Sequence, residues 1–158
     1  MADTVYQTPE LFIAEALSLQ KDEIPTASVI WLDKNTQTEL SKILGHTYPQ
    51  ARLRYWISNK NGIKNQTHVW ILDEIGKEYP ITAGFVVENK TIQRAQVLIY
   101  RETRGAEIHL PQFLAQFRST HLTENGLSKS VDGIAGATLS VNAMKKMAQA
   151  ALLLDSKL

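Results

Sequence analysis

The sequence predicts an α+β fold in which a mainly antiparallel sheet is flanked by helices before and after it. Two observations support this prediction. The segment from Leu139 onward repeats apolar residues at helical spacing. The middle of the chain consists of β-rich apolar runs separated by short turn signals, at residues 52–58, 68–72, 81–87 and 92–100. A length of 158 residues is sufficient to bury one core without metal or disulfide support.

Two helices and one strand are expected before the central strands. Residues 8–10, Thr-Pro-Glu, are typical of a helix start, because proline suits the first helical position and an acid suits the positive end of the helix. Its apolar face would contain Phe12, Ile13, Ala16 and Leu17. Residues 27–32 read as a strand. Thr36 with Glu39 fits a capping box for a second helix, which Gly45 would end.

The central strands are defined by alternation and by turn signals. Residues 52–58 alternate, with one face made by Leu53, Tyr55 and Ile57. Asn61-Gly62 predicts a turn, and residues 88–91 predict a hairpin between two apolar strands.

Two helices are expected after the strands. Pro111 would begin a short helix that carries Phe113, Leu114 and Phe117. The final helix would bury Met144, Met147, Ala148, Ala151 and Leu152.

Composition excludes several classes of function. The formal net charge of +1 lacks the basic excess of a nucleic-acid-binding protein. The absence of cysteine excludes disulfides, iron–sulfur centres and thiolate zinc sites. The four histidines lack metal-site spacing, so no metal site is expected. No apolar run reaches the roughly 18 residues that a membrane span requires.

The most informative segment is residues 131–140, Val-Asp-Gly-Ile-Ala-Gly-Ala-Thr-Leu-Ser. Its small residues allow close approach of another group, and they come directly before the final helix. Because a helix N-terminus exposes unpaired amides and a partial positive charge, phosphate binds there readily. Thr138 and Ser140 place hydroxyls at the same point. On the residues alone, however, these hydroxyls are more commonly ordinary helix caps.

The same segment resembles the flavinylation motif of FMN-binding domains, such as those in the C subunit of the sodium-pumping NADH:quinone reductase and the G subunit of Rnf complexes. That motif reads Asp, two free positions, Ser or Thr, Gly, Ala, Thr. Asp132, Gly136, Ala137 and Thr138 match it, and Ala135 departs from it by lacking a hydroxyl. Residues 81–87 and 97–105 also look like the strands and the Glu-Thr turn of that family.

The resemblance implies that the chain carries FMN, joined as a phosphoester to Thr138 by a separate flavin transferase that consumes FAD. It implies a redox carrier rather than a stand-alone catalyst. The expected partners are the transferase and other redox proteins, including membrane-bound or haem proteins. The implied location is periplasmic or otherwise extracytoplasmic. The chain shows no signal-peptide pattern, and a cytoplasmic location stays open.

The resemblance implies a role for Asp132, and other side chains are candidate contacts of the cofactor. Asp132 would serve transferase recognition or loop order, with an Asx-turn as the alternative. Arg101 and Arg104 are phosphate candidates, although surface charge is the commoner role. Tyr55, Trp56 and Trp70 are candidate walls for the flavin ring, although core packing is commoner. The cofactor-binding residues expected are Glu102, Thr103, Asp132, Gly136, Ala137, Thr138, Leu139 and Ser140.

The sequence suggests residues 1–80 as an N-terminal portion of unassigned role and residues 81–158 as the FMN-binding domain, together one compact unit. Two alternatives stay open. The chain could hold FMN without a covalent bond and act as a reductase on a small oxidant. It could instead be a non-redox binding or interaction module in which the Gly-Ala-Thr loop only caps a helix.

Overall fold

The structure is a computed structural model that describes residues 3–58 and 66–158. The predicted α+β class is confirmed: six antiparallel strands form one sheet in the order β1-β6-β5-β4-β3-β2, and a separate two-stranded sheet pairs β7 with β8. The strands are β1 (Thr4–Val5), β2 (Thr26–Trp31), β3 (Arg52–Ile57), β4 (His68–Ile75), β5 (Pro80–Glu88), β6 (Thr91–Tyr100), β7 (Leu122–Thr123) and β8 (Gly126–Leu127).

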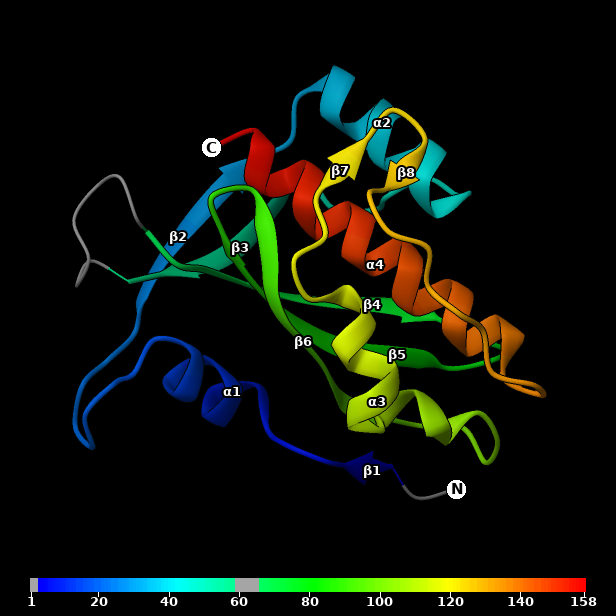
Figure 1. The fold of residues 1–158 in the computed structure, drawn as a ribbon. Coiled ribbons are helices and arrows are strands. Elements are labelled where there is room, and N and C mark those ends of the chain that lie inside the picture. The colour runs from blue at the N-terminus through cyan, green and yellow to red at the C-terminus, as the bar shows by residue number, and fades with distance from the viewer. Residues whose placement is uncertain (1–2, 59–65) are drawn as a thin grey trace.

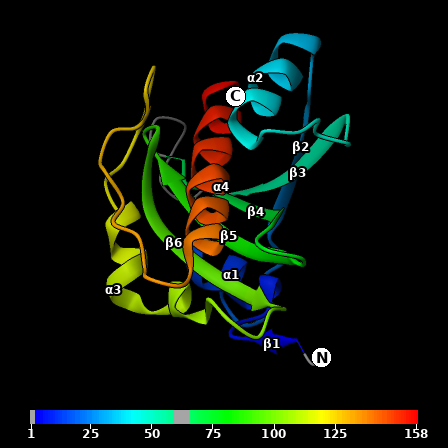
Figure 2. The same cartoon turned by 90° about the vertical axis from the view of Figure 1, so that its right-hand side faces the viewer.

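Helices cover both faces of the large sheet (Figures 1 and 2). α4 and α2 pack on one face, where the larger core cluster lies, and α1 packs on the other. The helical elements are α1 (Pro9–Ala16), α2 (Lys34–Leu44), η2 (Ala106–His109), α3 (Pro111–Leu114), η3 (Ala115–Phe117) and α4 (Thr138–Ser156), of which η2 and η3 are short 3-10 helices.

The predicted start of the first helix is confirmed, because the Thr8 hydroxyl caps α1 and accepts a hydrogen bond from the Leu11 amide at 3.2 Å. The predicted cap of the second helix is wrong. Asp33, not Thr36, is the N-cap, and its Oδ1 accepts a hydrogen bond from the Thr36 amide at 2.8 Å. An aspartate three residues earlier thus captures the amide and begins the helix one turn sooner. Gly45 ends α2 in the left-handed conformation, as expected.

The strand predictions largely hold. The hairpin turn at Asn89 and Lys90 joins β5 and β6, with positive φ at both residues. β4 extends three residues beyond the predicted end at Leu72. The predicted turn at Asn61-Gly62 lies outside the described residues.

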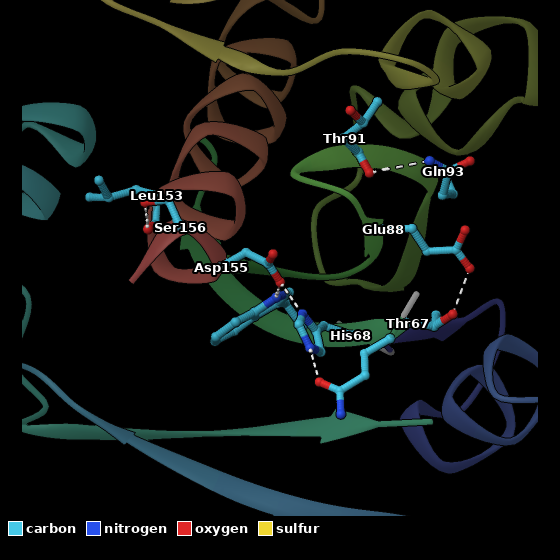
Figure 3. A network of polar contacts seen from close by, with 10 residues as sticks. Thr67, His68, Glu88, Thr91, Gln93, Leu153, Asp155 and Ser156 are labelled. Carbon is cyan, nitrogen blue, oxygen red and sulfur yellow. Dashed lines mark hydrogen bonds and ion pairs between the residues drawn. The ribbon is translucent and has the colours of Figure 1, made fainter. Parts of the chain in front are cut away.

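The long C-terminal helix organises the larger core. Its residues Met144, Met147, Ala148, Ala151 and Leu152 are all buried, as the helical spacing predicts. Near its end, the Asp155 carboxylate is buried and accepts hydrogen bonds from His68 Nδ1 at 2.7 Å and Trp70 Nε1 at 2.9 Å (Figure 3). These bonds attach the end of α4 to β4, so the position of the helix across the sheet is fixed.

Candidate functional site

A cleft of about 460 Å³ opens at one end of the large sheet. This volume lies within the roughly 300–1,000 Å³ of ordinary small-molecule sites. Three parts of the chain surround it: the β4–β5 turn, the loop after β6, and the loop that leads into α4, with the first turn of that helix (Figure 1). Its lining residues are Lys77, Glu78, Tyr79, Glu102, Thr103, Arg104, Gly105, Gly136, Ala137, Thr138, Leu139 and Ser140.

The sheet register explains why these segments meet. β5 and β6 are antiparallel, with Thr82 opposite Ile99, so the residues just before β5 lie beside those just after β6. α4 packs on the same sheet, and its N-terminus reaches this end. Of the eight residues expected to bind the cofactor, seven therefore line one cleft, and Asp132 lies outside it.

Thr138 is exposed and is the first residue of α4. The alternative in which Thr138 caps the helix is wrong, because the N-cap is Ala137 and no side chain bonds to the first turn there. A helix without a side-chain cap leaves its first amides to water or to a ligand, and its dipole favours an anion. The cleft therefore combines a free hydroxyl with a helix end that suits phosphate.

The loop of residues 132–137, called the acceptor loop below, lies at the surface in front of α4, with Ile134 packed against the core and Ala137 buried (Figure 1). A Cβ placed on Gly133 or Gly136 would meet no atom within 4 Å. Gly136 has a φ of +82°, a conformation that glycine adopts readily. Ala135, which departs from the family motif, is exposed and lines a second hollow, which also includes Thr138.

Glu102 lines the cleft, and its carboxylate holds the β4–β5 turn. Its Oε1 accepts hydrogen bonds from three successive backbone amides, those of Lys77 at 3.0 Å, Glu78 at 2.5 Å and Tyr79 at 2.9 Å. Burial by itself raises the pKa of Glu102, but the three amides together outweigh burial and lower it. The charged carboxylate thus joins two walls of the cleft.

Ser140 is buried, and its hydroxyl bonds to Tyr100 at 2.8 Å. The Tyr100 hydroxyl also donates to the backbone oxygen of Arg104. Burial raises the pKa of Tyr100, so this hydroxyl stays protonated and able to donate at neutral pH. These contacts attach the first turn of α4 to the loop after β6, which fixes the position of Thr138 relative to the opposite wall.

The two arginines proposed as phosphate contacts have different roles in the structure. Arg101 donates to the backbone oxygen of Pro80 at 2.7 Å and lies 3.6 Å from an Asp3 carboxylate oxygen, so it holds strands together. Arg104 is exposed and lines the cleft. With Lys77 on the facing turn, Arg104 offers positive charge to a phosphate-bearing ligand.

The aromatic residues proposed as ring walls belong to the core instead. Trp70 is fully buried and stacks with Tyr55 at a centroid distance of 5.0 Å, while Trp56 packs against the α1 side. The cleft has two other apolar walls, Tyr79 at 43% exposure and Leu139 at 52%. Exposed apolar side chains lining a cleft provide the flat surface that a planar ring would cover.

The sequence analysis did not identify the β4–β5 turn as a wall of the cleft. The available signal was the hairpin register, since pairing β5 with β6 brings residues 77–79 beside Glu102.

Within residues 3–58 and 66–158, no cluster of histidine and acidic residues could hold a metal ion. No described helix is long and apolar enough to cross a membrane.

The cleft combines a helix N-terminus that suits phosphate, a nearby hydroxyl, basic side chains and apolar walls. This combination is typical of a site for a phosphorylated aromatic cofactor. Residues 76–153 match the family model of the FMN-binding domain. The matched domain indicates FMN as the cofactor; the helix end would hold its phosphate and the apolar walls its ring. The search of curated proteins found no match for the chain.

Proposed function

We propose that the chain is an electron-transfer module that carries FMN as a phosphoester on Thr138. The observation that supports this most directly is the position of Thr138, which is exposed at an uncapped helix N-terminus in the cleft. An acceptor for an external enzyme must be reachable, and the acceptor loop has open space around both of its glycines.

In the proposed attachment, a flavin transferase supplies FAD and activates it. The Thr138 oxygen forms a bond to the phosphorus on the flavin side, the pyrophosphate bond breaks, and AMP leaves. The hydroxyl proton passes to a base of the transferase. The chain itself contributes the hydroxyl and the amides of the first helical turn, which suit the negative phosphoryl oxygens.

Bound flavin supplies one- and two-electron transfer, and the protein tunes this chemistry through nearby charge and hydrogen bonds. Lys77 and Arg104 would stabilise negative charge near the cofactor, while Tyr79 and Leu139 would cover the ring. A tethered flavin cannot dissociate, so it suits an extracytoplasmic compartment in which free FMN is scarce. The proposed partners are redox proteins, with membrane-bound and haem proteins as the first to test.

The decisive measurement is intact mass after co-expression with a flavin transferase. Wild-type protein should gain about 438 Da, the mass of FMN less water, and Thr138→Ala should gain nothing. Thr38→Ala is the control, because Thr38 is an exposed hydroxyl on α2, outside the cleft, and its loss should leave Thr138 modified. An unmodified wild type, under conditions that modify a known acceptor, would rule out covalent attachment.

Non-covalent binding is the second candidate, since an uncapped helix end can hold phosphate without a bond to Thr138. Denaturation separates the two. A covalently bound flavin stays with the unfolded chain during gel filtration, whereas a non-covalent one separates from it. If the wild-type protein binds no FMN under any condition, even with transferase and FAD present, the chain is a non-redox interaction module.

A further inference from the structure

The beginning of the acceptor loop is held by one side chain from a distant segment. Gln116, in η3, accepts a hydrogen bond from the Asp132 amide at its Oε1 at 2.7 Å. Its Nε2 lies 3.4 Å from the Asp132 backbone oxygen and 3.3 Å from that of Phe113, and donates to both. The side-chain amide therefore binds both backbone polar groups of the first motif residue.

The later part of the loop is held by packing, because Ile134 is half-buried against the larger core cluster and Ala137 is buried. Val131 is buried just before it, and a bond from the Ala137 amide to the Ile134 oxygen at 3.0 Å closes its far end. A Cβ added to either loop glycine, Gly133 or Gly136, would meet no atom within 4 Å. The Gln116 contact therefore fixes the start of the segment that leads to Thr138, at Asp132, while Ile134 and Ala137 anchor its later part.

The Asp132 side chain is exposed, and no hydrogen bond or ion pair to its carboxylate is present among the described residues. The Asx-turn alternative predicted that this carboxylate would accept a backbone amide within its own loop. Instead, Gln116 orders the backbone and leaves the carboxylate facing solvent. The carboxylate is thus available to another molecule.

We propose that Gln116 is a positioning residue for flavin attachment: it holds Asp132 so that the acceptor loop meets the transferase in one conformation. This inference rests on the proposed covalent function. Gln116 touches neither Thr138 nor the cleft, so its effect passes through the Asp132 backbone. A glutamine is needed because the site requires a donor and an acceptor on one planar group.

The test compares modification rates of purified, flavin-free protein with transferase and FAD, followed by intact mass. Gln116→Ala should lower kcat/KM for modification about tenfold, the value expected when hydrogen bonds worth about 1.4 kcal/mol are lost. Gln116→Glu keeps the acceptor but not the donor, so it should fall between Gln116→Ala and wild type. Gln112→Ala is the matched control, because Gln112 and Gln116 line one hollow beside Asp132, and no hydrogen bond from the Gln112 side chain is present among the described residues.

Hydrogen exchange supplies a readout that does not depend on the transferase. The Asp132 amide should exchange faster in Gln116→Ala than in wild type. The melting temperature of this variant should stay near that of wild type. Equal modification rates in wild type and Gln116→Ala would overturn the positioning role. A wild type that is never modified would overturn the covalent function itself, so the two failures are distinguishable. If Gln116→Ala folds poorly, Gln116→Glu and the exchange data still decide.

Discussion

At the scale of single residues, the shape of the cleft depends on close contacts between the residues of its walls. Gly105 shows this best. Its φ is +86°, and a Cβ at this position would lie 2.6 Å from both Ser140 Oγ and Tyr100 Oη. Both oxygens belong to the hydrogen-bonded contact that attaches α4 to the loop after β6. Glycine is therefore required here by conformation and by space.

Gly105→Ala should destabilise the protein by about 2 kcal/mol, because it adds backbone strain and a steric clash. Urea unfolding would measure this change. Gly133→Ala is the matched control, since a Cβ there meets no atom within 4 Å, and it should change stability by less than about 0.5 kcal/mol. Equal effects from the two substitutions would contradict the packing described for Gly105.

Glu102 should make stability depend on pH. Its pKa in the folded protein is lowered below the roughly 4.3 of an unfolded glutamate. The carboxylate therefore stabilises the fold above that pH, and this stabilisation is lost as the pH falls through the folded-state pKa. Glu102→Gln should cost about 1 kcal/mol at pH 7, a modest value because water screens the partly exposed group, and little at pH 3.

Urea unfolding of wild type and Glu102→Gln at both pH values measures that difference. Glu78→Gln serves as the control, because Glu78 is also in the cleft lining but its side chain accepts none of these three amides. A constant difference between Glu102→Gln and wild type from pH 7 to pH 3 would show that the carboxylate charge does not hold the turn.

At the scale of elements, α4 links the site to the core because it is fixed at both ends. Ser140 bonds to Tyr100 near its start, and Asp155 bonds to His68 and Trp70 near its end (Figure 3). The helix between these contacts is buried on one side up to Gln149 and on all sides from Ala150 to Asp155. Its N-terminus, and with it Thr138, is therefore placed by contacts that lie along the whole helix.

Asp155→Ala should destabilise the protein by about 3 kcal/mol, because it leaves the Trp70 indole N–H and His68 Nδ1 without their buried acceptor. Trp70 is fully buried, so its fluorescence should report the loss in urea unfolding. Lys157→Ala is the control, because its ion pair with Glu39 lies at the surface and should contribute less than about 1 kcal/mol. Similar losses in both variants would show that the buried acceptor is unimportant.

At the scale of the whole molecule, the matched family segment does not contain all of the strands that complete its sheet. Residues 76–153 begin after β4, yet β4 pairs with β5 along its whole length, from His68 opposite Val87 to Ile75 opposite Pro80. α2, also outside the segment, contributes Leu40 and Leu44 to the same core cluster as α4. The N-terminal half thus completes the core beneath the cleft.

A fragment of residues 76–153 should therefore fail to fold alone. It would leave one edge of β5 unpaired and expose apolar surface of α4. Circular dichroism and the dispersion of amide NMR signals would test this, with the full chain as the control. A fragment with cooperative unfolding and dispersed signals would show that the N-terminal half is dispensable for folding.

Local patterns in the sequence were sufficient to predict most of the helices and strands. They were also sufficient to predict the phosphate-binding chemistry of residues 131–140. The Thr-Pro-Glu start of α1, the glycine end of α2, the hairpin at residues 88–91 and the apolar stripe of α4 each depend on neighbouring residues. The cap of α2 was mispredicted because Asp33 and Thr36 both suit the role, and only the backbone geometry decides between them.

The sequence by itself determined the α+β class, the final helix and the small-residue loop with Thr138 at a helix start. Only the tertiary structure decided what faces Thr138, because those residues come from strands joined through the sheet register. It brought the turn at residues 77–79 onto Glu102, placed Tyr79 and Leu139 as the apolar walls, and put Gln116 on Asp132. The contacts of Glu102 and Gln116 join separate segments of the chain, so they follow from strand pairing and from the packing of the whole fold rather than from the pattern within one segment.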